Sequence, residues 1–189
     1  MSLSQILELM KLDPRYTEKL TRRDEVWHGR IFSVEDDEVE LPDGSLAPRE
    51  LVRHPGGAGV VAVHDGRVCL VRQFRVALGR MTLEIPAGKL DPGEDGAAAA
   101  ARELREETGL VASRLEPLVS VLGSPGFTDE RTQVFFATDL AQAEANPDEG
   151  ELVGALWVEL GDVLEAIRAG AIQDGKTVSG VLAAAVLLG

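Results

Sequence analysis

The sequence is short of several residue types, and each shortage excludes a class of protein. The sequence has one cysteine, Cys69, among its 189 residues. This excludes an internal disulfide framework and favours a location in the reducing cytoplasm. Basic residues number 19 against 32 acidic ones, for a net charge of −13, so binding to nucleic acid or to an anionic membrane is not expected. The longest apolar run, residues 181–188, is too short to span a bilayer, and residues 1–16 lack the pattern of a signal peptide. These absences predict a soluble cytoplasmic protein.

What is present is the composition of a folded protein, with 44% apolar and 27% charged residues. Apolar positions between residues 24 and 53, with a hairpin turn at Asp43-Gly44, predict strands, and the acidic run 35–38 predicts a solvent-exposed bend between them. Further strands are expected near residues 59–63, 68–71, 82–86, 115–122, 132–138 and 153–158, and helices at 3–12, 95–107, 162–168 and 177–188. This order predicts an α/β (α+β) architecture, with an N-terminal helix and sheet over residues 1–54 and a second domain over residues 55–189.

Three glutamates crowd the end of the helix predicted at residues 95–107. Glu106 and Glu107 lie three and four residues after Glu103, so the three side chains share one helix face. They also lie near the C-terminal end, where the helix dipole disfavours negative charge. A divalent cation with oxygen ligands would relieve this repulsion. The alternative is a solvated acidic helix end without a ligand.

The residues around these glutamates resemble the Nudix box. The positions that match are Gly88, Glu94, Arg102, Glu103, Leu104, Glu106, Glu107, Gly109 and Leu110, and none of the specified positions departs. The chain from residue 57 onward is thus similar to a Nudix hydrolase domain, which implies a mixed β-sheet sandwiched between helices. The metal ligands that the resemblance implies, for Mg²⁺ or alternatively Mn²⁺, are Glu103, Glu106, Glu107 and the Ala87 carbonyl. Glu94 is expected to pair with Arg102 and to hold the loop.

Other segments look like those of the ADP-ribose (ADP-sugar) pyrophosphatase subgroup. Pro125 lies 15 residues after Leu110, about where members acting on ADP-ribose carry a proline; an ordinary Pro-Gly turn is the alternative. Segments 71–75 and 83–88 are similar to strand ends that line the site. The resemblance implies that Arg75 contacts the diphosphate, as a guanidinium matches phosphate oxygens, and that Glu84 lies near the metals or the terminal ribose.

Residues 24–53 resemble the extra antiparallel sheet that such enzymes use for dimerisation and for binding adenine, so a homodimer is implied. Trp27 is one of two tryptophans and lies in a polar part of the chain, where a monomer offers little core to bury it. The candidate base-binding residues are Trp27, Phe32 and Arg49, and Arg53 is a further candidate for binding the substrate. For Phe32, packing in the core or in the dimer interface is an equal alternative.

The reaction implied is metal-assisted attack of water on a pyrophosphate, which converts ADP-ribose to AMP and ribose 5-phosphate. The general base is expected in loop 146–151. Glu151 is favoured by its place at the entry to the next strand, Glu149 or Asp148 would serve in a shifted register, and a solvated acidic loop is the alternative without function. NADH, a GDP-sugar or a dinucleoside polyphosphate are alternative substrates. A nucleotide-sensing module without hydrolysis is a further alternative, which the retained box glutamates argue against.

Overall fold

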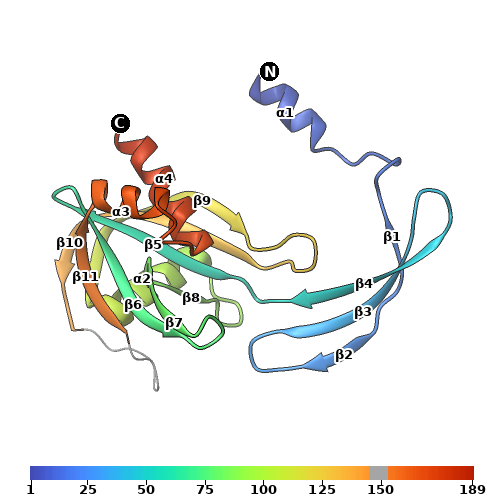
Figure 1. Ribbon diagram of the computed structural model, residues 1–189, viewed down its shortest axis with the longest axis horizontal. Coiled ribbons are helices and arrows are strands. Elements are labelled where there is room, and N and C mark those ends of the chain that lie inside the picture. Colours follow the sequence, from blue (N-terminus) through green and yellow to red (C-terminus); the bar gives the residue numbers. More distant parts are fainter. Residues whose placement is uncertain (145–152) are drawn as a thin grey trace. The chain divides into compact units, whose positions relative to one another are not determined.

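The computed structural model describes residues 1–144 and 153–189, and the chain divides into two compact units (Figure 1). The N-terminal unit comprises residues 1–54 with residues 126–128, and the C-terminal unit comprises residues 55–125 with residues 129–189. Each unit has its own sheet. The longest described helix has 14 residues, and no helix in the described ranges is long and apolar enough to cross a membrane.

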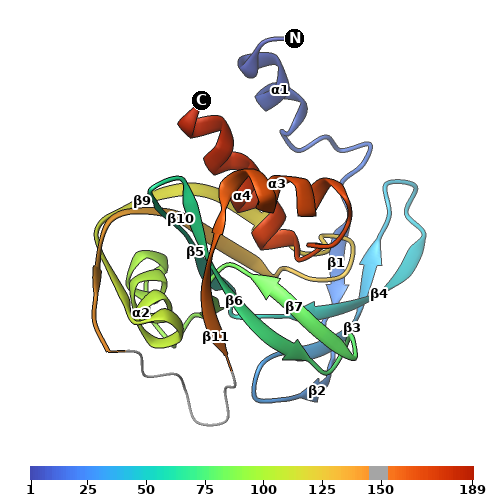
Figure 2. The ribbon, with the colours of Figure 1, turned by 60° about the vertical axis from the view of Figure 1, so that its left-hand side comes forward.

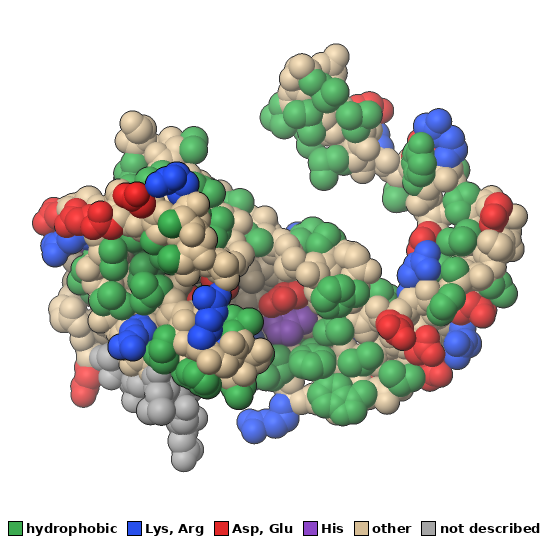
Figure 3. Space-filling model, viewed as in Figure 1, with side chains coloured by type: hydrophobic (Ala, Val, Ile, Leu, Met, Phe, Trp, Pro, Cys, Tyr) green, Lys and Arg blue, Asp and Glu red, His purple; other side chains and the backbone are tan. Residues whose placement is uncertain are grey.

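The N-terminal unit begins with a short exposed helix. Helix α1 (Leu3–Leu9) starts at a capping box in which Ser2 and Gln5 satisfy each other's backbone N–H groups. None of its residues is buried, and its surface is rich in apolar side chains (Figure 3). Leu3, Leu7 and Leu9 are each more than half exposed. The helix therefore contributes no core to this unit.

A four-stranded antiparallel sheet forms the rest of the N-terminal unit. Its central strand is β3 (Ser33–Glu40), with β4 (Leu46–Arg53) along one edge and β1 (Lys19–Arg22) and β2 (Glu25–His28) sharing the other. The predicted Asp43-Gly44 hairpin turn is confirmed: Leu41 N donates to Ser45 O at 2.8 Å, and Gly44 has a φ of 83°. Glycine suits this left-handed conformation because it has no Cβ.

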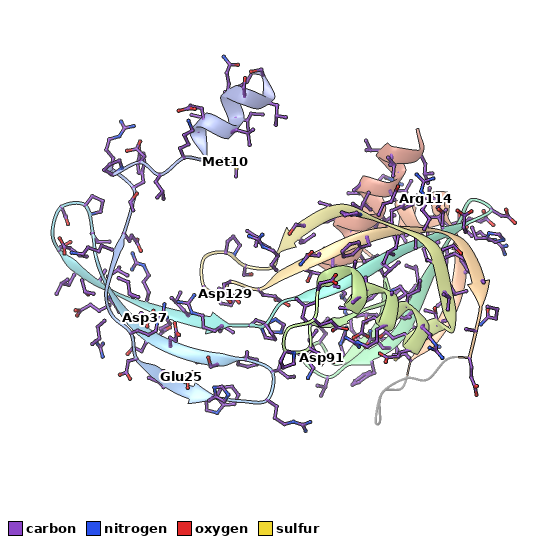
Figure 4. The ribbon with its side chains drawn as sticks, turned by 180° about the vertical axis from the view of Figure 1, so that it is seen from behind. Met10, Glu25, Asp37, Asp91, Arg114 and Asp129 are labelled. Carbon is purple, nitrogen blue, oxygen red and sulfur yellow. The ribbon has the colours of Figure 1, made fainter. Side chains whose placement is uncertain are left out.

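The bend expected at residues 35–38 is wrong, because these residues form the middle of β3. Their burial alternates along the strand, and Glu35 and Asp37 are 6% and 0% exposed. Asp37 is labelled on this sheet in Figure 4. Arg53 compensates the two charges: its Nε donates to Glu35 Oε2 at 2.6 Å, and its Nη2 lies 3.7 Å from Asp37 Oδ2. A neighbouring guanidinium thus allows a polar sequence to occupy inward strand positions.

The C-terminal unit is built on a seven-stranded mixed sheet with the order β11-β6-β5-β10-β9, in which β7 also pairs with β6 and β8 with β5. Strand β10 runs parallel to β5, and the other pairs are antiparallel. The strands are β5 (Gly57–His64), β6 (Arg67–Arg75), β7 (Arg80–Glu84), β8 (Ala87–Lys89), β9 (Leu110–Leu122), β10 (Arg131–Gln142) and β11 (Gly154–Glu159).

Helices cover both faces of this sheet (Figure 2). On one face, α2 (Gly96–Thr108) buries Leu104 in a cluster with Val60 and Cys69. On the other, α3 (Leu160–Arg168) and α4 (Gly175–Leu188) pack in a cluster that contains Val61. Val60 and Val61 are neighbours in β5 and point to opposite faces. The predicted sandwich of a mixed sheet between helices is therefore confirmed.

Cys69 lies in the core and is 1% exposed. Burial, with a smaller contribution from the negative charge of Glu107, raises the pKa of the thiol to about 12. The thiolate, which is the reactive form, is therefore scarce at neutral pH.

Helix α2 agrees with its prediction because both of its ends are marked in the sequence. Asp95 caps the start by accepting from Ala97 N and Ala98 N at 2.7 and 3.2 Å, and Gly109 ends the helix with a φ of 69°. Strands β9 and β10 are longer than expected, because their pairing continues from Arg131–Leu122 to Gln142–Leu110. Pro117 interrupts the sequence pattern and is accommodated at a register shift in this pair.

Candidate active site

Two glutamates of α2 lie against the short strand β8. The carboxylate of Glu103 is so close to Gly88 that a Cβ at position 88 would lie 2.1 Å from Glu103 Oε1. The Glu107 Oε2 atom accepts a hydrogen bond from Ala87 N at 2.9 Å. Both side chains are nearly buried, with Glu103 8% and Glu107 6% exposed. The absence of a Cβ at Gly88 thus leaves the space that the Glu103 carboxylate occupies.

Arg102 joins the carboxylates of this region into one cluster. Its Nη1 donates to Glu103 Oε1 at 2.6 Å and to Glu106 Oε2 at 2.9 Å. Its Nε and Nη2 donate to the two oxygens of Glu94, each at 3.0 Å, so the predicted pairing of Glu94 with Arg102 is present. These bonds, that with Glu94 foremost, raise the pKa of Arg102. One guanidinium therefore offsets the repulsion among three carboxylates.

The donor set suits a hard divalent cation. Carboxylate and carbonyl oxygens are the ligands that Mg²⁺ and Mn²⁺ prefer, and the space at Gly88 places the Glu103 carboxylate beside the β8 backbone. Within residues 1–144 and 153–189, no three Asp, Glu, His or Cys side chains are gathered into a set that could hold a metal ion in this conformation. Arg102 lies between Glu103 and Glu106. The residue types are therefore those of a divalent-metal site, and the Arg102 guanidinium holds Glu103 and Glu106 in place.

A second charged cluster surrounds Glu84, which is 2% exposed at the end of β7. Arg75 donates to it twice, from Nε at 2.7 Å and from Nη2 at 2.6 Å. Thr82 Oγ1 donates at 2.7 Å and Lys176 Nζ at 2.6 Å. Burial raises the pKa of Glu84, but the hydrogen bonds and charges of Arg75, Lys176 and Thr82 outweigh it and lower the pKa to about 2. Glu84 is therefore a carboxylate at neutral pH.

A cavity of about 790 Å³ opens beside this cluster. Arg75 and Glu84 line it together with Arg72 and Arg80, and apolar walls come from Leu83 and Ile172. Such a mixture of apolar walls and a few convergent charges is typical of small-molecule sites.

The base-binding candidates lie in the N-terminal unit. The rings of Trp27 and Phe32 are in contact, with centroids 5.1 Å apart, and are 50% and 38% exposed. Neither Arg49 nor Arg53 extends freely into solvent: Arg49 forms an ion pair with Glu18, and Arg53 with Glu35. A pocket of about 420 Å³ in the same unit is lined by Val26, Leu51 and Phe127 among others. The exposed aromatic pair is thus the feature of this unit suited to stacking.

The remaining predicted site residues lie in loops. Pro125 is exposed in the turn after β9. Asp148, Glu149 and Glu151, the candidates for the general base, lie outside the described residues. The assignment of the base stays a prediction.

Sequence reasoning missed part of the Glu84 cluster. Lys176 and Thr82 contact Glu84, and Asp174 contacts Lys176. Thr82 could have been found, because residues two apart on a strand share a face. The contact between Lys176 and Glu84 spans 92 positions, and no local spacing indicates it.

A comparison with models of protein families identifies the family of this chain. The NUDIX domain model matches residues 53–179. The chain belongs to the Nudix family. The matched range includes the α2 glutamates, Arg102 and Gly88, so the charged cluster around Arg102 is this chain's Nudix box.

Relatives extend the likeness of this Nudix chain beyond the box. It is 40% identical to the ADP-ribose pyrophosphatase of Bacillus subtilis, covering 85% of this chain and 88% of the relative. Against the ADP-ribose pyrophosphatase of Mycobacterium tuberculosis the identity is 39%, over 82% and 77%. The methanol dehydrogenase activator of Bacillus methanolicus is also 40% identical, over 88% and 91%.

A solved structure agrees in fold. The crystal structure of an ADP compounds hydrolase superposes with a TM-score of 0.81 and covers 91% of this chain and 94% of its own, at 23% sequence identity. The Nudix fold of the chain is therefore supported by shape as well as by sequence.

Proposed function

We propose that this Nudix chain hydrolyses the pyrophosphate bond of ADP-ribose, or of a related ADP-sugar, to give AMP and ribose 5-phosphate. The observation that carries the proposal is the Nudix box, with the Glu103 carboxylate seated at Gly88 and Glu107 hydrogen-bonded to Ala87 N. It occurs in a chain that is 39–40% identical to two ADP-ribose pyrophosphatases over more than three quarters of each protein.

The box would hold the divalent metal that Nudix hydrolases generally need, which we propose to be Mg²⁺, with Mn²⁺ as the alternative. Glu103, Glu106, Glu107 and the Ala87 carbonyl are the proposed ligands. A divalent ion held by these residues would neutralise charge on the diphosphate and lower the pKa of the attacking water. Arg102 keeps the carboxylates together, because its guanidinium contacts both Glu103 and Glu106.

The Arg75 side chain is the proposed contact to the diphosphate. Two of its nitrogens are bound to Glu84, and the side chain is 42% exposed. The edge that faces away from Glu84 can donate to phosphate oxygens with the geometry that a guanidinium favours. Glu84, paired with Arg75, is proposed to lie near the metals or the terminal ribose. Pro125 is proposed to lie in the loop on which substrate preference depends.

The N-terminal unit is proposed to bind adenine and to form a homodimer. Trp27 and Phe32 present aromatic surface for stacking on the base, and Arg49 and Arg53 are the polar candidates beside it. Exposed apolar side chains on α1 favour association with a second copy. The acidic charge and the single buried cysteine support a cytoplasmic location.

A substrate panel tests the activity. Purified protein would be incubated with Mg²⁺ and, separately, with ADP-ribose, NADH, GDP-mannose and diadenosine polyphosphates, and the products identified by mass spectrometry. We expect AMP and ribose 5-phosphate from ADP-ribose, with the highest kcat/KM of the panel. The panel is needed because a relative with a different name, the methanol dehydrogenase activator, is as similar as the pyrophosphatases. A higher kcat/KM for another compound would replace the proposed substrate.

A pair of variants in the same loop tests the general base. Glu151→Gln should lower kcat about 100-fold and leave KM and Mg²⁺ affinity nearly unchanged, because it removes the proton acceptor and no ligand. Glu149→Gln is the matched control and should cost much less. The opposite result would move the base to Glu149, and near-normal activity of both variants would place it outside these two residues.

A further inference from the structure

The Glu84 carboxylate is held by donors from two directions. Its Oε1 accepts from Arg75 Nε and from Thr82 Oγ1, while its Oε2 accepts from Arg75 Nη2 and from Lys176 Nζ. Arg75 and Thr82 belong to the β6–β7 pair, whereas Lys176 comes from the first turn of α4. The orientation of this carboxylate therefore depends on a helix on the face of the sheet opposite to α2.

Lys176 is itself fixed in place. Its side chain is 17% exposed, and its Nζ lies 2.9 Å from Asp174 Oδ1. The other oxygen of Asp174 accepts from Thr177 N at 3.0 Å and from Thr177 Oγ1 at 2.6 Å. Ile85 N, next to Glu84 in the chain, donates to Thr177 Oγ1 at 2.9 Å. The start of α4 is thus bound to the end of β7 through side chains and backbone alike.

The cluster is balanced in charge, with Glu84 and Asp174 facing Arg75 and Lys176. Arg75 uses its Nε and Nη2 for Glu84, and its Nη1 has no hydrogen-bond partner among the residues that the structure describes. Since a bidentate pair fixes the plane of a guanidinium, the direction of Nη1 follows from the position of Glu84.

We propose that Lys176, anchored by Asp174, is a positioning residue that sets the Glu84 carboxylate and through it the edge of Arg75 that faces phosphate. The inference rests on the proposed function, because it assigns Arg75 to the substrate diphosphate. Lys176 acts through Glu84 and Arg75 and does not itself touch substrate. Without its ammonium group, Glu84 Oε2 loses one of its two donors, the carboxylate can rotate, and the Arg75 pair loses its bidentate geometry.

The expected defect is in binding. A misplaced Arg75 weakens contact to a diphosphate that is present in both the ground state and the transition state, so KM should rise while kcat changes little. For Lys176→Met we expect KM for ADP-ribose to rise about tenfold, with kcat within about threefold of wild type. Lys176→Arg keeps the charge and should recover most of the loss. Arg168→Met is the matched control, because Arg168 is exposed and pairs with Glu165 on the neighbouring α3.

A double-mutant cycle separates positioning from a merely structural role. In an Arg75→Met background, Lys176→Met should raise KM no further, since the group through which Lys176 acts is absent. A similar additional rise in that background would show that Lys176 acts independently of Arg75 and would overturn the proposal. An unchanged KM in Lys176→Met alone, or no recovery in Lys176→Arg, would also overturn it.

Two measurements keep the test decisive. Thermal unfolding shows whether the Lys176→Met variant is folded. If it is not, the Asp174→Asn variant is measured in its place, because this change removes the charge that anchors Lys176 and should raise KM by a smaller factor. An unchanged KM in Asp174→Asn would contradict the proposal. Wild-type protein that fails to hydrolyse ADP-ribose would refute the proposed function, whereas an active wild type with an unaffected Lys176→Met variant would refute this inference alone.

Discussion

In the C-terminal unit an apolar cluster packs against each face of the sheet, whereas in the N-terminal unit the inward positions of the central strand are Ser33, Glu35, Asp37 and Val39. Of the described residues of the N-terminal unit, Val39 is the one apolar side chain that is buried. Hydrophobic burial supplies most of the stability of a fold, so the C-terminal unit can fold around its own core. The N-terminal unit depends on buried charges that are paired, which add little stability but are costly to leave unpaired.

The largest effect is expected on kcat, from a change in the charge of the Nudix box. Glu107→Gln keeps the size of the side chain and can still accept from Ala87 N, but it removes one charge from the box. We expect kcat for ADP-ribose to fall by a factor on the order of 10² to 10³, because electrostatic stabilisation by the metal site carries most of this chemistry. Steady-state kinetics at saturating Mg²⁺ measures the effect. Circular dichroism should be unchanged, and near-normal turnover would remove Glu107 from the site.

The next effect should appear in the N-terminal unit alone. Arg53→Met removes the cation nearest to Glu35, which also pairs with Asp37, and leaves Glu35 with Arg23 at 3.7 Å. We expect a loss of about 3 kcal/mol in the unfolding free energy of this unit. Each unit has one tryptophan, Trp27 in the first and Trp157 in the second. Urea unfolding of Trp27→Phe and Trp157→Phe backgrounds, followed by fluorescence, therefore reports the two units separately.

The matched control for that experiment is Arg22→Met. Arg22 and Asp24 form an ion pair in the same unit, with both side chains about half exposed, and such pairs contribute less than about 1 kcal/mol. An equal loss in Arg22→Met and Arg53→Met would contradict the view that buried charge is the weak point of this unit.

In the C-terminal unit, one buried charge should make stability depend on pH. The pKa of Glu84 is lowered from 4.5 to about 2 in the folded chain, so its contribution is fully present above pH 4.5 and is lost as the pH falls toward 2. We expect the difference in unfolding free energy between wild type and Glu84→Gln to shrink by about 2 kcal/mol from pH 6 to pH 3. A constant difference across this range would show that the Glu84 carboxylate is not held by Arg75 and Lys176.

The smallest effect is expected on α1. Leu7 is 55% exposed and no residue of this helix is buried, so Leu7→Asp should change the unfolding free energy by less than about 0.5 kcal/mol. If α1 takes part in the proposed dimer, light scattering of the full-length variant should show a larger fraction of monomer. A large loss of stability in dilute monomer would instead indicate that α1 packs within its own chain.

Much of the C-terminal unit could be predicted because its signals are local. Asp95 and Gly109 mark the two ends of α2, and the continuous apolar run at residues 59–63 indicated the buried strand β5. The box glutamates were found because their spacing places them on one helix face. These features depend on neighbours in the sequence.

The N-terminal sheet and the Glu84 cluster could not be predicted as well, because they depend on distant partners. The acidic run at residues 35–38 indicated a bend, and it forms a strand because Arg53, 18 residues after Glu35, supplies the opposite charge. Likewise Glu84 was predicted in the site without Lys176, its partner from α4. A charge that is compensated at long range has the same local sequence as one that is solvated.

The core position of Cys69 has a practical use in the laboratory. Because the chain has one cysteine and its thiol is buried with a pKa of about 12, maleimide and iodoacetamide reagents should leave the native protein unlabelled at neutral pH. A cysteine introduced at an exposed position of either unit would then carry a dye or spin label selectively. Pairs of such labels, one in each unit, would allow the distance between the units to be measured in solution without first removing the natural thiol.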